Sequence, residues 1–575
     1  MKTLSNSALR TALLGSFGLA ALIGCNKNNE PEPNKPTPGG NNTCSYTVVS
    51  VTNAINTPTT WQSCKVYVVG PNVTLGSTLT IEAGAIVKFQ ANAGLSLTAG
   101  GRIEAVGTAD NPVVFTSVLD DANGGDTNND GTATTPAKRN WGSIALAGQS
   151  GSRFEHCRFM YGGAGAPNTT LDLFGASATV RNCRFVRNGG GAPNFKGALS
   201  ASRAPTNTVI EGNTFYLNEM PLRITNLYSL NNSNTFSNPA NAAEKNDYNG
   251  IWVEDATSTS VALTWGETEV PFVVGGLTLD APMTLEPGVM VKFDDLGNLV
   301  LTASSGRILA NGTAAQPVVF TSIHDDATGG DTNANGNATA PARKSWRGLV
   351  LNTTTGSVLD NSRFYYGGSG GTVLNLTGAV AEVRNSVFAH NGDDVSTATR
   401  AVLDAHASAG GTVIRSNTFF DNVRPLSITS NIDLDDSNTF SNPANAAEKN
   451  QYQGIYVDWN ANLLKPNVSW GETEVAFVNL SNIDLAPANT LALGNNVVLK
   501  FNPGLQMTLR TGTSQLLNHN GSGVRFTSVK DDALGGDSNG NGTANAPAAN
   551  DWRGIYIDTL PGVWVQGSHI LYQSH

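Results

Sequence analysis

Two short stretches decide the fold: residues 180–188 read VRNCRFVRN, and residues 209–218 read VIEGNTFYLN. Both combine β-branched and aromatic residues with asparagine or glycine, which is typical of short strands that end in turns. Their phenylalanines belong to a series with steps of 26, 30 and 21 residues: Phe159, Phe185, Phe215 and Phe236. Such a step, with little helical periodicity between the strands, is typical of one coil of a solenoid.

We therefore predict an all-β protein: a right-handed parallel β-helix in which each coil stacks on the one before it. Equivalent residues of successive coils should then form internal ladders. The alternative is an array of β-sandwiches, which would show paired hairpin turns and alternation over longer strands. The short strands and their glycine and asparagine breaks favour the β-helix.

The chain of 575 residues contains two and a half copies of one unit. Residues 234–246 recur without change at 438–450, and the segment that starts at Phe115 returns at Phe320 and Phe526. The predicted organisation is a first repeat over 44–270, a second over 271–475 and a partial third over 476–575. Each repeat should contribute several coils to one continuous solenoid.

The first residues predict export and a lipid anchor. Residues 1–24 hold two basic residues and an apolar run, which is typical of a secretory signal and too short for a transmembrane span. The sequence Leu22-Ile23-Gly24-Cys25 resembles the lipobox of bacterial lipoproteins, in which the cysteine is acylated. The alternative is an ordinary signal peptide with a chance cysteine. The proline- and asparagine-rich residues 25–43 are predicted to be an extended tether.

Four further cysteines suggest disulfides, since an exported chain meets oxidising conditions. The local pairing joins Cys44 to Cys64 and Cys157 to Cys183. The second pair lies about one coil apart, and both of its members are serine in the second repeat. The alternative for Cys157 and Cys183 is two reduced thiols in the core, because stacked parallel strands give imperfect disulfide geometry.

Several coils carry a resemblance to a known family. The motifs are TIEAGAIVKF at 80–89 with TLEPGVMVKF at 284–293, and GTADNPVVFTS at 107–117 with GTAAQPVVFTS at 312–322. With the acidic loops described next, they resemble exported β-helix proteins of Gram-negative bacteria, especially surface lipoproteins of the Bacteroidota type with the pectate-lyase-like superfold. The resemblance covers most of residues 67–575. It implies fold and export, whereas this superfold carries lyases, hydrolases and adhesins alike.

Three acidic loops are the strongest chemical signal, with ten carboxylates in the windows 120–131, 325–336 and 531–542. Carboxylates this close repel one another unless a cation lies among them, and all-oxygen ligands favour calcium. The candidate ligands are Asp120, Asp121, Asp126, Asn128 and Asp130; Asp325, Asp326, Asp331, Asn333 and Asn335; Asp531, Asp532, Asp537, Asn539 and Asn541.

The loops start like EF-hand loops but do not continue as such. Oxygen-bearing side chains stand at positions 1, 3 and 5 with glycine at 6, yet position 12 is alanine instead of the bidentate glutamate: Ala137, Ala342 and Ala548. The paired acids upstream of each loop are expected to supply the missing ligands by folding back. The alternative is a solvated turn in which Asp and Asn side chains bond their own backbone.

Recurring tryptophans have two interpretations. Glycans often stack on exposed rings, but recurrence in a solenoid is more simply explained by packing within or between coils. The repeat-equivalent sets are Trp61, Trp265 and Trp470, and Trp141, Trp346 and Trp552.

The sequence gives little indication of catalysis. None of the seven histidines recurs between repeats. A lyase of this superfold would place a basic residue beside calcium-bound acids; the candidates are Lys138, Arg223, Arg363 and Arg424, which we expect to be solvated surface charges instead. No basic run is present, and 35 Lys and Arg against 45 Asp and Glu give a net charge of −10. This balance excludes a nucleic-acid partner on electrostatic grounds.

The combined prediction is a calcium-stabilised β-helix lipoprotein, anchored by lipid to the outer membrane and exposed at the cell surface. It should bind or display glycan or extracellular matrix without cleaving it. The alternative function is a calcium-dependent polysaccharide lyase or glycoside hydrolase on the same fold.

Overall fold

The structure is a computed structural model that describes residues 44–148, 151–192, 196–254, 261–295, 298–301, 306–393, 400–459, 465–510 and 514–575. The chain divides into two units, Met1–Cys44 and Ser45–His575. The predicted signal peptide, the lipidated Cys25 and the tether lie outside the described residues. In the described part of the chain, no helix is long and apolar enough to cross a membrane.

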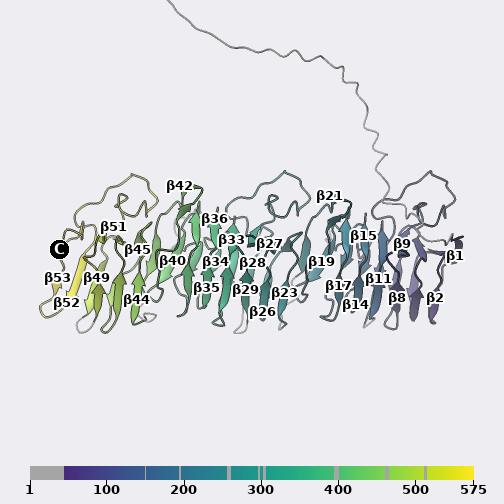
Figure 1. The fold of residues 1–575 in the computed structure, drawn as a ribbon, viewed down its shortest axis with the longest axis horizontal. Coiled ribbons are helices and arrows are strands. Elements are labelled where there is room, and N and C mark those ends of the chain that lie inside the picture. Colours follow the sequence, from purple (N-terminus) through teal and green to yellow (C-terminus); the bar gives the residue numbers. More distant parts are fainter. Residues whose placement is uncertain are drawn as a thin grey trace, which may run out of the picture. The chain divides into compact units, whose positions relative to one another are not determined.

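The unit Ser45–His575 is a parallel β-helix, which confirms the predicted all-β fold (Figure 1). Short strands follow one another around the coil, and most pair in parallel with a strand one coil further on. The first long sheet, sheet 1, has seven strands: β1 (Thr47–Val51), β3 (Lys65–Val69), β6 (Ile86–Phe89), β9 (Val113–Ser117), β12 (Cys157–Met160), β15 (Arg184–Val186) and β18 (Thr214–Tyr216).

Two longer sheets continue the solenoid. Sheet 2 has thirteen strands: β4 (Val73–Leu75), β7 (Leu95–Leu97), β10 (Ile144–Ala145), β13 (Leu171–Asp172), β16 (Leu199–Ser200), β19 (Leu222–Thr225), β22 (Ile251–Glu254), β24 (Phe272–Val274), β27 (Met290–Phe293), β30 (Val318–Ser322), β33 (Ser362–Tyr365), β36 (Val387–Ala389) and β39 (Thr418–Phe420). Sheet 3 has ten: β25 (Leu277–Leu279), β28 (Asn298–Leu301), β31 (Gly348–Leu351), β34 (Leu374–Asn375), β37 (Leu403–Ala405), β40 (Leu426–Thr429), β43 (Ile455–Asp458), β45 (Phe477–Asn479), β48 (Val498–Phe501) and β51 (Arg525–Ser528).

Shorter sheets complete the coils. The first two have six strands each: β2 (Thr59–Trp61), β5 (Thr78–Ile81), β8 (Arg102–Val106), β11 (Ser152–Glu155), β14 (Ala178–Arg181) and β17 (Val209–Glu211); then β23 (Leu263–Trp265), β26 (Pro282–Leu285), β29 (Arg307–Asn311), β32 (Ser357–Asp360), β35 (Ala381–Arg384) and β38 (Val413–Arg415). The last two are β44 (Asn467–Trp470), β47 (Thr490–Leu493) and β50 (Gln515–Leu517); and β46 (Ile483–Leu485), β49 (Gln506–Arg510), β52 (Gly554–Asp558) and β53 (Val563–Trp564).

Two antiparallel hairpins interrupt the coils at equivalent places. Hairpin 1 is formed by β20 (Ser237–Asn238) and β21 (Asn241–Lys245), and hairpin 2 by β41 (Ser441–Asn442) and β42 (Asn445–Lys449). Both come from the stretch that is identical in the two repeats, so the same sequence folds in the same way twice.

The sheets do not end where the sequence repeat ends. In sheet 2, β22 pairs in parallel with β24, although β24 is the second-repeat counterpart of β3 in sheet 1. In the same way, β43 of sheet 3 pairs with β45. Each new repeat therefore starts on the next sheet around the coil. This continuity joins the repeats into one uninterrupted solenoid.

Aromatic ladders fill the interior. The rings of Phe115, Phe159, Phe185, Phe215 and Phe236 stack in turn, with centroid distances of 4.9, 4.7, 4.9 and 5.3 Å. Every one of these rings is buried. The second repeat contains the same stack from Phe320 to Phe440. The predicted internal ladders are confirmed, and each ring covers the apolar faces of its neighbours.

Asparagine ladders line the turns that follow the aromatic strands. Asn218 Oδ1 accepts hydrogen bonds from the backbone N–H and the side-chain amide of Asn188, at 3.0 and 2.9 Å. The amide of Asn218 in turn donates to Phe185 O and to Asn246 Oδ1. Asn391, Asn422 and Asn450 repeat this pattern. The side chains therefore satisfy buried backbone groups where the chain leaves the sheet.

The cysteines behave in two ways. Cys44 and Cys64 are disulfide-bonded, as predicted. Cys157 and Cys183 are buried free thiols, so the expected bridge between them is wrong. Their sulfur atoms are instead directed at backbone carbonyls of the preceding coil, Ala105 O at 3.3 Å and Phe154 O at 3.4 Å. These hydrogen bonds hold both thiols in the core ladder as separate small side chains.

Candidate metal centres

Three equivalent loops carry the predicted metal ligands. Acidic loop 1 (residues 118–143) follows β9, acidic loop 2 (323–347) follows β30, and acidic loop 3 (529–553) follows β51. These strands belong to sheets 1, 2 and 3, yet the loops rise on the same edge of the solenoid (Figure 1). Each repeat starts one sheet further around the coil, so equivalent strands of the three repeats belong to different sheets.

The first acid of each pair anchors its loop. Asp120 is buried and accepts hydrogen bonds from the hydroxyl of Thr116 at 2.6 Å and from the amide of Asn123 at 2.8 Å. Asp325 and Asp531 are also buried. They accept hydrogen bonds from the hydroxyl groups of Thr321 and Thr527 at 2.8 and 2.7 Å, respectively. In all three loops this carboxylate binds the side chain of the preceding strand and fixes the start of the turn.

A buried lysine lies beneath each loop. Lys88, Lys292 and Lys500 occupy equivalent strands and are fully buried. Lys292 Nζ donates to Gly330 O at 2.6 Å and to Thr332 Oγ1 at 3.3 Å. Lys88 and Lys500 donate in the same way to Gly125 O and Gly536 O. Each ammonium group therefore holds the paired-glycine turn of its loop against the sheet.

Burial shifts the titration of these lysines. It lowers the pKa of Lys292 and of Lys500 to about 8, while the carboxylates of the loop above act in the opposite direction. The pKa of Lys88 is also lowered by burial. In the windows 120–131, 325–336 and 531–542, one buried ammonium group faces four, three and three aspartates, respectively. Negative charge therefore remains in excess within each of these three windows.

The aspartate at position 1 of each loop organises the turn. Asp126 Oδ2 accepts the backbone N–H of Gly131 at 2.8 Å, and Asp331 and Asp537 accept those of Gly336 and Gly542 at 2.7 Å. This hydrogen bond is the main reason that the pKa of Asp126 lies below its ordinary value. The side chain-to-backbone hydrogen bonds expected for a self-bonded turn are thus present. They also favour the ionised form of the Asp126 carboxylate, which is the form that binds a metal ion.

The remaining oxygens in loop 1 converge. Asp121, Asp126 and Asp130 each place a carboxylate oxygen within 4.8 Å of the other two. Asp121 Oδ1, Asn128 Oδ1 and Asp130 Oδ1 are buried atoms with no hydrogen-bond partner among the described residues. Burial raises the pKa of Asp121, and the charge of Asp126 raises it further. Converging carboxylates beside buried oxygens that lack donors are the arrangement that a hard cation satisfies.

The same atoms lack partners in the other two loops. They are Asp326 Oδ1 and Asn335 Oδ1 in loop 2, and Asp532 Oδ1 and Asn541 Oδ1 in loop 3, again within the described ranges. The pKa values of Asp326 and Asp532 are raised by burial first and by the charges of Asp331 and Asp537 second. In loops 2 and 3 the second acid thus feels the charge of the aspartate at position 1, as Asp121 does in loop 1, whereas the first acid accepts the hydroxyl of the preceding strand.

Position 3 differs between the loops. Asn128 directs its amide to Asp130 Oδ2 at 2.8 Å and leaves its oxygen without a donor. In loops 2 and 3, Asn333 Oδ1 and Asn539 Oδ1 accept backbone N–H groups at 3.3 and 3.2 Å. Loop 1 thus offers one more side-chain oxygen and one more carboxylate than its counterparts.

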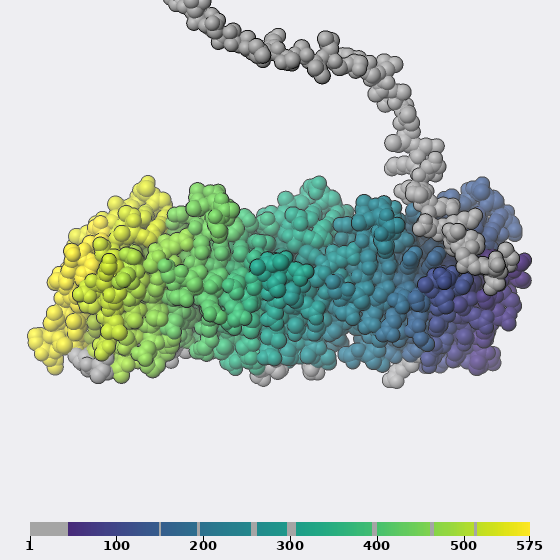
Figure 2. Space-filling model, in the orientation of Figure 1, coloured from purple at the N-terminus to yellow at the C-terminus, as the bar shows by residue number. Residues whose placement is uncertain are grey.

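The loops and the hairpins form a ridge of separate raised lobes along one edge (Figure 2). Lys138, at the end of loop 1, pairs with Asp247 after hairpin 1 at 2.6 Å. Asn249 N then donates to Asp331 O of loop 2 at 2.9 Å, and Gln453 N after hairpin 2 donates to Asp537 O of loop 3 at 2.8 Å. Each hairpin end is therefore a support for the acidic loop that follows.

The basic residues considered for catalysis are engaged elsewhere. Besides the Lys138 pair, Arg223 pairs with Glu254 at 3.1 Å, and Arg363 donates to Ser362 O and Asn385 O. Arg424 lies over the rings of Tyr452 and Tyr456, 4.9 and 4.3 Å from their centroids. The charges of the buried lysines act on the second acid of each pair, and their ammonium groups bind carbonyl oxygens of the loops.

The recurring tryptophans are packing residues. All six are buried, and each stacks on an aromatic ring of the same or the next coil, for example Trp141 on Phe89 at 4.2 Å and Trp346 on Phe293 at 4.4 Å. The packing interpretation is confirmed, so these rings do not form an exposed platform for sugars.

Sequence reasoning missed the lysines. Their signal is present in the sequence: a charged residue in the centre of the apolar strands IVKF, MVKF and VLKF, at equivalent positions of three repeats. A charge retained in such a strand needs a buried partner. The partner is a backbone carbonyl of a loop more than 35 residues further along the chain, which the strand alone does not indicate.

The comparisons with known proteins agree with this architecture. A family model described as a pectate-lyase like beta helix domain matches residues 53–168, which include the coils around acidic loop 1. Neither the curated proteins nor the solved structures give a match to this chain. The match concerns the fold, and activity does not follow from this fold.

Proposed function

We propose that this protein is a lipid-anchored, calcium-stabilised β-helix rod that binds or displays glycan or extracellular matrix at the cell surface without cleaving it. The observation that carries the calcium part is the recurrence of the same donor-free buried oxygens in three loops. The chemistry of the donors, carboxylate and amide oxygens without sulfur, suits a hard cation.

Calcium would supply the charge that the loops lack. In loop 1, Asp121, Asp126, Asn128 and Asp130 would hold the ion, with Asp120 and Lys88 as the supporting shell. Asp326, Asp331 and Asn335 would act in loop 2, and Asp532, Asp537 and Asn541 in loop 3. Because the segments after the hairpins contact the acidic loops that follow, the ion would stabilise these contacts as well as the loop itself.

The non-catalytic role is supported by the placement of the basic residues. A lyase needs a free base next to calcium-bound acids. Here the lysines under the loops are buried, and the other candidates are engaged with carboxylates, carbonyls or aromatic rings. Repetition of one loop three times also fits a structural or binding surface better than a single active cleft.

The lipid anchor and the outer-membrane location rest on the sequence Leu22-Ile23-Gly24-Cys25 and on the polar tether that follows it. Labelling of cells with a fatty-acid probe tests this part. The parent protein should be labelled and membrane-bound, while Cys25→Ser should lose the label and leave the membrane fraction. Equal labelling of both forms would contradict the anchor.

The functional role is tested with the purified protein and acidic or neutral polysaccharides, with and without calcium. We expect binding to immobilised polymer without release of unsaturated products or reducing ends. Calcium-dependent release of product, abolished by Lys138→Ala or Arg223→Ala, would overturn the proposal in favour of a lyase or hydrolase.

A further inference from the structure

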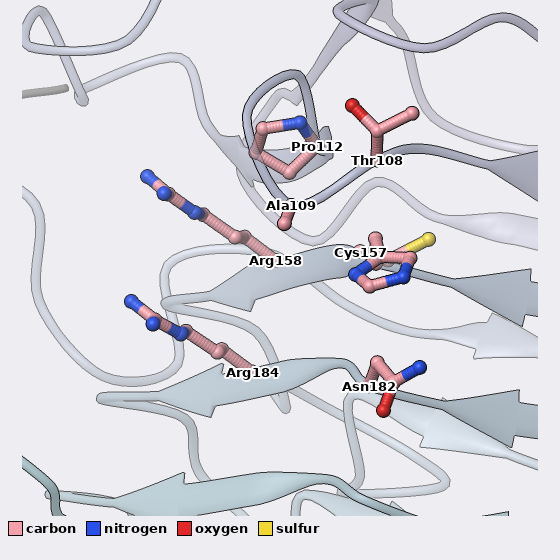
Figure 3. A pocket seen from close by; sticks show the side chains of 8 residues that line it. Thr108, Ala109, Pro112, Cys157, Arg158, Asn182 and Arg184 are labelled. Atoms are coloured by element: carbon pink, nitrogen blue, oxygen red, sulfur yellow. The ribbon is translucent and has the colours of Figure 1, made fainter.

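Two arginines lie side by side on the outer face of sheet 1. Arg158 in β12 is in register with Arg184 in β15, so their Cα atoms occupy adjacent rungs about 4.8 Å apart. Figure 3 shows their side chains running parallel, with both guanidinium groups pointing the same way. Parallel stacking of like charges costs free energy unless a counter-charge is present.

Neither guanidinium group pairs with a carboxylate of the described residues. On the neighbouring face, Arg153 pairs with Glu155 at 2.7 Å, and Arg181 pairs with Glu211 at 2.8 Å. Within the described part of the chain, neither Arg158 nor Arg184 forms an ion pair. Burial lowers the pKa of Arg158, and the positive charge of Arg184 lowers it further. In a chain of net charge −10, such a pair is an exception that needs explanation.

A small pocket of about 110 Å³ opens beside the pair. Its other walls include polar side chains of the adjoining turns: Thr108, His156 and Asn182. Asn182 and Thr108 lie on the opposite side of the pocket from the guanidinium groups (Figure 3). The volume is that of a few water molecules, which suits one compact acid group rather than a whole sugar ring.

The second repeat lacks this arrangement. Arg363, the counterpart of Arg158, is in register with Val387. On the same face, His390 takes the place of Arg187, and its Nδ1 lies 2.6 Å from Asp421 Oδ2. Asp421 also pairs with Arg343. The positive surface is therefore specific to the first repeat and is not a requirement of the fold.

From this geometry we infer that Arg158 and Arg184 form a binding site for an oxyanion, a carboxylate or sulfate group carried by an extracellular glycan. Two adjacent guanidinium groups present parallel N–H donors, which match the oxygens of such a group. The pocket beside them admits the acid group, and the exposed side chain of Arg184 leaves this end of the pair open to solvent. That a glycan carries the acid group rests on the proposed function; the oxyanion site itself rests on the geometry of the two arginines.

The test compares four probes on the full-length protein by titration calorimetry in calcium: a sulfated oligosaccharide, an oligouronate, a neutral oligosaccharide of the same length, and sodium sulfate. The variants are Arg184→Val, which installs the second-repeat residue at an exposed position, and Val387→Arg, which reconstructs the pair beside Arg363. Arg363→Ala is the matched control. Circular dichroism melting shows that each variant is folded.

We expect the acidic oligosaccharides to bind more tightly than the neutral one, with an affinity that falls as salt is added. Arg184→Val should weaken that binding at least tenfold, Arg363→Ala should leave it unchanged, and Val387→Arg should add a second site. Equal binding by Arg184→Val and the parent protein would overturn the inference while leaving glycan binding in place. Binding of sulfate alone, lost in Arg184→Val, would support the oxyanion site and count against the glycan role.

Discussion

The ammonium group of Lys292 donates a hydrogen bond to the carbonyl oxygen of Gly330 at 2.6 Å, beneath the second acidic loop. The same relationship recurs in the first and third loops. A buried cation thus holds each turn from below, while carboxylates gather above it. The same support therefore lies beneath the paired-glycine turn at three places in the solenoid.

Replacement of this lysine should separate its two roles. Lys292→Met keeps the length of the side chain but leaves Gly330 O without its donor and the carboxylates without their counter-charge. In chelator we expect a loss of about 1 to 3 kcal/mol in the free energy of unfolding. The loss should be smaller in calcium, because the ion supplies the missing positive charge. Equal losses in both conditions would contradict the joint role of lysine and ion.

The free thiols give a chemical test of the core. In a Cys25→Ser background, unfolding without reductant should expose two reactive thiols, at Cys157 and Cys183, while Cys44 and Cys64 stay bonded. Mass analysis after alkylation counts them. The double variant Cys157→Ser and Cys183→Ser, which copies Ser362 and Ser386 of the second repeat, should fold and show none. A bridged 157–183 peptide in the unreduced parent would refute the assignment.

We expect two buried glutamates to make the stability of the protein depend on pH. Glu267 and Glu472 each accept the backbone N–H groups of the next two residues at Oε1, while Oε2 has no partner within the described residues. Burial raises the pKa of Glu267 to about 7 and that of Glu472 to about 8. Since both values exceed the ordinary 4.5, the native state binds more protons than the unfolded state in this range.

The contribution of Glu267 and Glu472 to the free energy of unfolding is therefore fully present below about pH 4.5. It is lost as the pH rises through their native pKa values of about 7 and 8. Urea unfolding at fixed pH and saturating calcium should show this decline, on the order of 3 kcal/mol per residue. The double variant Glu267→Gln and Glu472→Gln should flatten it, whereas Glu286→Gln at an exposed position should not. A decline that persists in the double variant would show that other groups cause it.

The asparagine ladder makes a separate prediction about the turns. Asn218→Ala removes the acceptor of Asn188 N and the donor to Phe185 O, both of which are buried. We expect a destabilisation of about 2 kcal/mol or more, because these groups lose their partners. Asn241→Ala, on the exposed strand β21, is the control and should change stability little. Chemical denaturation measures both, and equal effects would contradict the ladder account.

The sequence predicted the coil architecture well, because the phenylalanine spacing and the strand-like stretches repeat once per coil. It also predicted that both acids of each pair fold back as ligands, and in loop 1 the structure brings Asp121 together with Asp126 and Asp130. It did not separate Asp120 from Asp121, since only the three-dimensional turn decides which one faces Thr116 and which one faces the loop centre. The sequence did not predict the arginine pair for a similar reason. Arg158 and Arg184 are 26 residues apart, and only the register of β12 and β15 brings them together.

The central claim is that each acidic loop holds one calcium ion, and calorimetric titration of the full-length, calcium-depleted protein tests it most directly. We expect three ions per chain, with dissociation constants at or below about 10⁻³ M, as in extracellular calcium modules. Asp126→Ala, Asp331→Ala and Asp537→Ala should each remove one ion. No calcium bound at millimolar concentration, with a melting temperature indifferent to chelator, would contradict the account and leave the loops as self-bonded turns.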